Sequence, residues 1–184
     1  MRMPRLFFAL QPKPAEQAAI SAALLPVVHA FGARPMPQAD LHLTLAFLGE
    51  VPADAIPGLQ RAAVNVATAL LSLQLSRIDY WAAPGVLCLL PEEATTAKPV
   101  QLAQALAVAA ISCGVRMDEK PFRAHVTVAR KVPPAASGKG PWPRPLREPL
   151  PFTADGFVLM ESARQREGPR YKVIHSWPSG STDP

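Results

Sequence analysis

The stretch Leu41-His42-Leu43-Thr44-Leu45 has a counterpart far along the chain, Ala124-His125-Val126-Thr127-Val128. Both stretches place a histidine and, two residues later, a threonine inside an apolar run that is typical of a β-strand. Side chains alternate between the two faces of a strand, so the histidine and the threonine of each stretch are expected to share one face. The residues of the first strand that are expected to face a core are Leu41, Leu43, Leu45 and Phe47.

Histidine and threonine in this arrangement suit acid–base chemistry on a phosphate. An imidazole can accept or donate a proton near pH 6.5, so His42 and His125 on opposite sides of a substrate could act as general base and general acid. The hydroxyls of Thr44 and Thr127 can donate hydrogen bonds to non-bridging phosphate oxygens. Such a set favours hydrolysis of a phosphodiester, especially a strained cyclic one.

Other readings of the two histidines are weaker. A single His-x-Thr strand is common and usually holds a buried histidine bonded to a backbone carbonyl, but two matched copies are hard to obtain by accident. A zinc site would need a third close ligand, and the same-face neighbours are threonine, alanine and Arg123. The sequence has no HExxH, CxxC, P-loop, GxGxxG or GxSxG motif. We therefore expect no metal, no cofactor and no serine nucleophile. Of the remaining histidines, His29 is expected to be a helix cap or a surface residue, and His175 to be structural.

Composition sets the class of protein. The chain has 184 residues, 49% of them hydrophobic, which suits one globular unit with a core. Its net charge is +5 and its pI about 9.6, a balance that weakly favours polyanionic partners. Cys88 and Cys113 lie in apolar stretches without CxxC spacing and are expected to be free thiols in a reducing compartment.

The amino-terminal apolar run is too short for a signal peptide and ends at Gln11-Pro12, and no stretch is long enough to span a membrane. We expect a soluble, cytoplasmic monomer with no membrane association.

Residue patterns predict an α+β fold. Alternating and apolar runs predict strands over 5–10, 41–48, 71–81, 86–90, 115–117, 122–129, 152–160 and 171–177. Helical spacing predicts helices over 14–29, 53–69 and 98–113. The proline-rich segment 131–149 is expected to be a loop, and 164–170 a basic connection. Because each half interleaves helices and strands, we expect residues 1–184 to form one domain of two similar, mainly antiparallel lobes, with the motif strands facing each other across a central cleft.

Beyond the motifs, the chain resembles a known family, the two-histidine (2H) phosphoesterases. The branch that it resembles most comprises the RNA 2′,3′-cyclic phosphodiesterases, also described as 2′-5′ RNA ligases of the LigT type. The segments that carry the resemblance are Arg5-Leu6-Phe7-Phe8-Ala9-Leu10, residues 41–51, residues 122–130 and Gly168-Pro169-Arg170-Tyr171. Two positions depart from the family pattern. Ala124 stands where proline is frequent, and Arg34-Pro35-Met36-Pro37 where an aromatic residue is frequent.

The resemblance implies a bilobal, pseudo-symmetric LigT-like fold with helices outside, and metal-independent hydrolysis of RNA 2′,3′-cyclic phosphate ends to a 2′-phosphomonoester. It implies catalytic roles for His42 and His125 and substrate-binding roles for Thr44 and Thr127. The reverse reaction with an RNA 5′-hydroxyl would give 2′-5′ ligation. We favour His125 as the base and His42 as the acid, an order that the sequence leaves open.

Two further residues are candidates for substrate binding. Arg130 matches the family's arginine after the second motif, but strict alternation turns it away from His125 unless the strand ends or bulges there. Tyr171 could stack a base or pack at a sheet edge. Residues that could guide an RNA backbone, or form a solvated basic face, are Arg164, Arg166, Arg170 and Lys172.

Two other functions stay open. One is a non-catalytic module that binds RNA or nucleotides, and the other is a phosphodiesterase for a small cyclic nucleotide such as ADP-ribose cyclic phosphate. The expected partners are RNA ends or nucleotides that carry a 2′,3′-cyclic phosphate.

Overall fold

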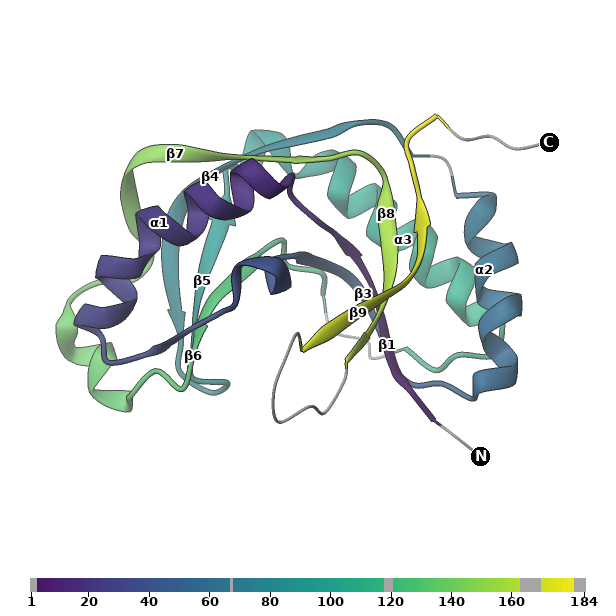
Figure 1. Ribbon diagram of the computed structural model, residues 1–184, viewed down its shortest axis with the longest axis horizontal. Helices are drawn as coiled ribbons and strands as arrows, with labels where there is room; N and C mark the ends of the chain where they lie inside the picture. Colours follow the sequence, from purple (N-terminus) through teal and green to yellow (C-terminus); the bar gives the residue numbers. More distant parts are fainter. Residues whose placement is uncertain (1–2, 67, 118–120, 163–169, 181–184) are drawn as a thin grey trace.

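The computed structural model describes residues 3–66, 68–117, 121–162 and 170–180 (Figure 1). The strands in this part of the chain are β1 (Arg5–Leu10), β2 (Arg34–Pro35), β3 (Leu43–Glu50), β4 (Leu71–Trp81), β5 (Val86–Pro91), β6 (Val126–Arg130), β7 (Arg144–Ala154), β8 (Phe157–Ser162) and β9 (Tyr171–Trp177). The helices are α1 (Pro14–Ala30), α2 (Ile56–Val64) and α3 (Ala97–Ser112). The described strands form one antiparallel sheet in the order β7-β4-β5-β6-β3-β1-β8-β9, and the short β2 pairs with β6.

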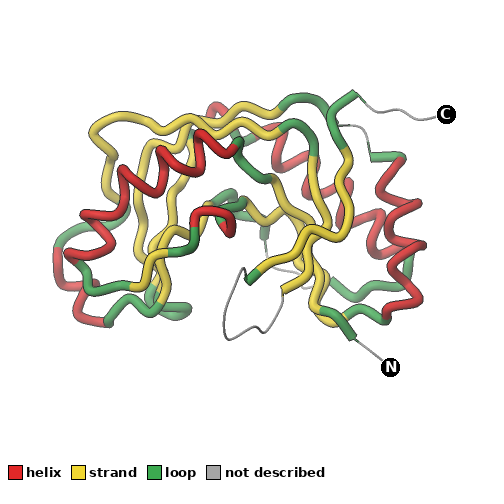
Figure 2. Tube along the Cα trace, in the orientation of Figure 1, coloured by secondary structure: helices red, strands yellow, loops and turns green. Residues whose placement is uncertain are grey.

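The sheet has two parts that meet at the motif strands. The strands β7-β4-β5-β6 form one part, and β3-β1-β8-β9 form the other. Between β6 and β3, the described register consists of Val126 opposite Leu43. Helix α1 packs on the first part, whereas α3 packs on β3 and α2 on α3 (Figures 1 and 2). The predicted α+β class, with antiparallel sheet and flanking helices, is confirmed.

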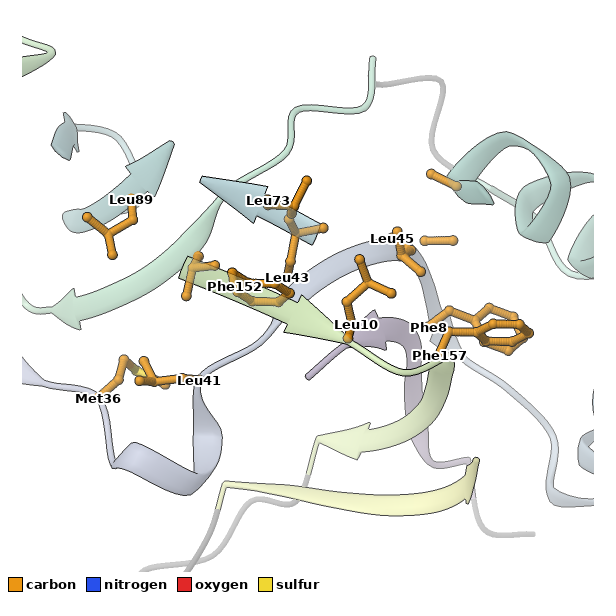
Figure 3. Close-up of a cluster of buried hydrophobic side chains, with 14 of the residues drawn as sticks. Phe8, Leu10, Met36, Leu41, Leu43, Leu45, Leu73, Leu89, Phe152 and Phe157 are labelled. Atoms are coloured by element: carbon orange, nitrogen blue, oxygen red, sulfur yellow. The ribbon is translucent and has the colours of Figure 1, made fainter. Parts of the chain in front are cut away.

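The two parts of the sheet are not the two halves of the chain, because β4 to β7 come from the continuous stretch 71–154 in the middle of the sequence. The part that contains the first motif combines β1 and β3 with β8 and β9 from the other end of the sequence. The motif strands, expected to face each other across a cleft, lie edge to edge instead. Beneath both parts runs a continuous core, in which Leu43, Leu89, Phe152 and Phe157 are each at most 1% exposed (Figure 3).

The start of helix α1 is held by Glu16, which bonds both to the helix terminus and to β7. Pro14 suits the first turn of α1, and the Glu16 carboxylate accepts a hydrogen bond of 3.1 Å from the backbone N–H of Lys13. The same carboxylate accepts hydrogen bonds from the backbone N–H and the hydroxyl of Thr153, at 2.8 and 2.7 Å. Glu16 therefore caps the helix and fastens it to β7.

A β-bulge changes the facing of side chains in β3. Its pairing with β1 passes from Ala46 directly to Thr44, so Leu45 has no partner of its own in that register. As a result Leu45 and Ala46 are both buried, and Phe47 turns to the face of Thr44 and is 45% exposed. The prediction that Phe47 belongs to the core is therefore wrong.

A bulge occupies the same place in the second motif strand. The pairing of β6 with β5 passes from Ala129 to Thr127, so Val128 is the extra residue. Val128 and Ala129 are both buried, and Arg130 consequently lies on the face of Thr127. The alternation rule alone would have turned Arg130 away.

The remaining differences from the predicted elements are local. The expected loop 131–149 contains the start of β7, and the expected strand 152–160 divides into the end of β7 and β8. Residues 115–117 are not a strand, and the predicted helix over 53–69 is reduced to a short 3₁₀ turn and α2. Because β7 is an edge strand, it tolerates prolines that cannot donate to a sheet ladder.

Candidate active site

The junction of the two sheet parts brings the motifs together. His42 directly precedes β3 and His125 directly precedes β6, flanking the apolar pair at the junction. Extending that antiparallel register by one residue on either side puts His42 opposite Thr127 and Thr44 opposite His125. Directly opposite side chains have Cβ atoms about 5 Å apart. The four predicted motif residues therefore form one group on a single face of the sheet.

Each histidine ring is oriented by the same backbone contact. Nδ1 of His42 lies 2.7 Å from the carbonyl oxygen of Asp40, and Nδ1 of His125 lies 2.7 Å from that of Arg123. A carbonyl oxygen can only accept, so each Nδ1 carries the proton and donates it. The Nε2 atom of each neutral ring is therefore left as a proton acceptor. The same arrangement of the histidine ring occurs in both motifs.

His42 lies in an aromatic setting. Its ring centroid is 5.0 Å from that of Phe7 and 4.8 Å from that of Tyr171, the latter edge to face. Burial lowers the pKa of His42 to about 4, against the opposing effect of the hydrogen bond to Asp40, and the charges of His125 and Arg130 lower it further. His42 is consequently neutral in the free protein near pH 7.

His125 rests on Trp81, at a ring-centroid distance of 4.4 Å. The indole N–H of Trp81 donates a hydrogen bond of 2.8 Å to the Asp79 carboxylate, and the Arg123 guanidinium lies 4.5 Å from the indole ring. Burial lowers the pKa of His125, and the positive charges of Arg123 and Arg130 add to that effect, while the hydrogen bond to the carbonyl of residue 123 opposes it. The sequence analysis missed Trp81 and Asp79.

Arg130 and Tyr171 are joined at the site. Nη2 of Arg130 donates a hydrogen bond of 3.1 Å to the hydroxyl of Tyr171, and the buried Nε of Arg130 has no hydrogen-bond partner among the described residues. The charge of Arg130 lowers the pKa of both His42 and His125, so the guanidinium is close to each. This leaves a partly buried cation with spare donor capacity beside both imidazoles.

Buried groups support the site from behind. The Asp40 side chain is 1% exposed and accepts a hydrogen bond of 3.1 Å from the backbone N–H of Arg170, which ties the start of β9 to the segment before His42. Sγ of Cys88 lies 3.8 Å from the hydroxyl oxygen of Thr127. Burial raises the pKa of Cys88 to about 12, so this thiol stays protonated.

Other predicted residues lie elsewhere. His29 is exposed at the end of α1, and His175 on β9 packs against Trp177 with ring centroids 4.5 Å apart. Arg170 and Lys172 are exposed near the start of β9, and Arg164 and Arg166 fall outside the described residues. Cys88 and Cys113 are free thiols, as predicted.

The described ranges contain no cluster of three or more histidine, cysteine, aspartate or glutamate side chains that could hold a metal ion. They also contain no helix with the length and apolar character needed to cross a membrane.

Known proteins resemble this chain in sequence. The family described as LigT like Phosphoesterase matches residues 10–88. An RNA 2′,3′-cyclic phosphodiesterase of Thermus thermophilus is 29% identical over 181 residues, covering 94% of this chain and 89% of the relative. An RNA 2′,3′-cyclic phosphodiesterase of Escherichia coli is 29% identical over 147 residues, covering 78% of each chain.

A solved structure shows the same fold over nearly the whole chain. Escherichia coli LigT complexed with 3′-AMP superimposes with a TM-score of 0.80 at 25% identity, over 97% of this chain and 99% of that one. Further structures of that protein are complexes with ATP and with NADP⁺. The chain therefore belongs to the LigT-like phosphoesterase family of the 2H superfamily.

Proposed function

We propose that the protein hydrolyses the 2′,3′-cyclic phosphate at RNA ends to a 2′-phosphomonoester, without a metal ion. The observation that supports this most is the pair of imidazoles at the starts of adjacent strands, each with Nδ1 bound to a backbone carbonyl and Nε2 left as an acceptor. The RNA 2′,3′-cyclic phosphodiesterases among its relatives support the same substrate class.

The reaction assigns a task to each group of the site. Water attacks phosphorus while one imidazole removes its proton through Nε2, and the bond from phosphorus to the 3′-oxygen breaks as the other imidazole protonates that oxygen. The hydroxyls of Thr44 and Thr127 donate to non-bridging oxygens, and Arg130 offsets the charge that develops on them. With an RNA 5′-hydroxyl and the reverse step, the same groups would form a 2′-5′ linkage.

The pKa values support one order of the acid and base roles. Burial lowers the pKa of both imidazoles, that of His42 to about 4, and the positive charge of His125 is one of the causes that lower the pKa of His42, so His125 takes up a proton before His42 does. When the free site holds one proton, that proton therefore resides on His125, which makes His125 the acid and His42 the base. This order reverses the preference drawn from the sequence.

A substrate with sulfur in place of the bridging 3′-oxygen tests that order, because a thiolate leaves with little help from an acid. It should restore most of the activity lost in His125→Ala and none of that lost in His42→Ala. Restoration in His42→Ala instead would contradict the assignment.

The central test is turnover of an oligonucleotide that ends in a 2′,3′-cyclic phosphate, in excess EDTA. His42→Ala and His125→Ala should each lose about 10²–10⁴-fold in kcat, while His175→Ala, outside the site, should retain activity. The expected product is the 2′-phosphomonoester. Full activity in either motif variant would reject the mechanism, and tight binding without turnover would indicate a binding module instead.

We further propose that the protein acts as a cytoplasmic monomer. The free thiols of Cys88 and Cys113 fit a reducing compartment, where buried cysteines persist unpaired. Sedimentation of the purified protein at the mass of one chain would support the monomer, and a stable dimer at the working concentration of the assay would contradict it.

A further inference from the structure

An apolar row crosses the sheet beside the catalytic group. Successive register partners on β3, β1, β8 and β9 place Phe47 opposite Phe7, Phe7 opposite Met160, and Met160 opposite Val173. Directly opposite residues point to the same face. That face is the one with the site, because the ring of Phe7 lies 5.0 Å from the imidazole of His42.

Within this row Phe47 is the exposed aromatic residue. Phe7 and Met160 are 3% and 1% exposed, whereas 45% of Phe47 is accessible. The bulge in β3 is what turns Phe47 to this face, since regular alternation would have buried it. The bulge therefore exposes an aromatic ring on the face of the sheet that carries the two histidines.

A cation accompanies the ring. Arg5 precedes Phe7 by two residues on β1 and therefore shares its face. The guanidinium carbon of Arg5 lies 5.4 Å from the centroid of the Phe47 ring, within the range of a cation–π contact. An exposed aromatic face beside an arginine matches the combination with which proteins hold single-stranded nucleic acid.

The distance from the site selects the part of the substrate. Phe7 fills the space beside His42 from the neighbouring strand β1, whereas Phe47 lies on β3 itself, five residues beyond His42, which corresponds to roughly 13–16 Å at a rise of about 3.3 Å per residue with the bulge allowed for. The nucleoside that carries the cyclic phosphate is bonded to the reacting phosphorus and stays close to the histidines. The ring of Phe47 is therefore better placed for the base of the preceding nucleotide.

We propose that Phe47 and Arg5 form a stacking subsite for the nucleobase that precedes the cyclic-phosphate nucleotide of an RNA substrate. This inference rests on the proposed function. Stacking on one aromatic side chain is tolerant of sequence because every base has a π-face, so the subsite would favour oligonucleotides over mononucleotides without selecting a base.

The test compares kcat/KM for a dinucleotide and a mononucleotide, each ending in a 2′,3′-cyclic phosphate. Phe47→Leu keeps an apolar contact with Phe7 but removes the aromatic face, and it should lower kcat/KM about 5- to 100-fold on the dinucleotide. On the mononucleotide it should change kcat/KM less than about 2-fold. Arg5→Gln should show the same pattern with a smaller loss, since it removes the charge of the cation–π contact but leaves the aromatic ring in place.

Two control variants guard the interpretation. Phe47→Tyr retains the ring and should behave like the wild type. Ile111→Ala removes an apolar side chain that is 57% exposed on α3, away from the site, and should leave kcat/KM unchanged on both substrates. Equal effects of Phe47→Leu on both substrates, or no effect on either, would overturn the subsite. A wild-type protein that turns over neither substrate would instead reject the proposed function, so the two failures are distinguishable.

Discussion

The burial of His42 carries a cost in stability that depends on pH. Its pKa is about 4 in the folded protein and 6.5 in an unfolded chain. As the pH falls below 6.5, His42 becomes protonated in the unfolded chain, but in the folded protein it stays neutral until about pH 4. The free energy of unfolding therefore decreases as the pH falls through this window. From these two pKa values, the free energy of unfolding should decrease by about 2 kcal/mol between pH 7 and pH 5 through this residue alone.

The variant His42→Asn isolates this effect, because an asparagine amide can still donate to the carbonyl of Asp40 but does not titrate. Urea unfolding at pH 7, 6 and 5 and constant ionic strength gives the free energy of each protein. The wild type should lose about 2 kcal/mol more than His42→Asn over this range. The melting temperature of the variant minus that of the wild type should therefore be about 4–8 °C greater at pH 5 than at pH 7. Thr44→Val, which adds no titrating group, should follow the wild type. Parallel curves for wild type and His42→Asn would refute the inferred burial of this imidazole.

Further predictions concern the groups around the two histidines. Tyr171→Phe removes the acceptor of the Arg130 hydrogen bond and should lower kcat/KM about 10-fold, whereas Arg130→Lys, which loses the planar fork, should lower it about 10²-fold; equal losses in steady-state kinetics would contradict a supporting role for Tyr171. Trp81→Leu should admit water to the imidazole of His125, which raises its pKa and shifts one limb of the pH profile of kcat/KM to higher pH. Asp79→Asn, which weakens the hold on Trp81, should cause a smaller shift. Unchanged profiles in both variants would contradict a positioning role for the indole. Cys88, buried and with its pKa raised to about 12, should resist a thiol reagent at pH 8 until the protein is unfolded, and rapid modification of the native protein, located by mass spectrometry, would contradict its placement.

The catalytic candidates were predictable because the signal is local. A period of two within a strand puts a histidine and a threonine on one face whatever the neighbouring strands do. The duplicated motif required only that the two strands lie close, and pairing of Leu43 with Val126 meets that requirement. The bounds of two internal strands also followed from local pattern, those of β1 from its apolar run and those of β4 from its period-two alternation.

The facing of Phe47 and Arg130 was not predictable from the sequence. In each case a bulge one residue after the threonine shifts the alternation, and a bulge is a property of the pairing with a neighbouring strand. No residue type at position 45 or 128 announces it. Local pattern therefore indicated the two candidate histidines but could not place the side chains three residues beyond the threonines.

Long-range contacts account for the other omissions. Trp81 ends β4, and its role depends on its contact with His125 across the sheet. The one available signal was the spacing of Asp79 and Trp81, which puts a carboxylate and an indole on the same face of one strand. The prolines of β7 suggested a loop, because its position at the sheet edge, where proline is tolerated, follows from the topology and not from local pattern.

The account depends on two imidazoles acting on one phosphate. A crystal structure of the protein with a nucleoside 2′-monophosphate, the expected product, measures this directly. Nε2 of His42 and Nε2 of His125 should each lie about 2.7–3.2 Å from an oxygen of the same phosphate or its adjoining ribose. A phosphate bound by one histidine alone, or bound away from both, would contradict the account.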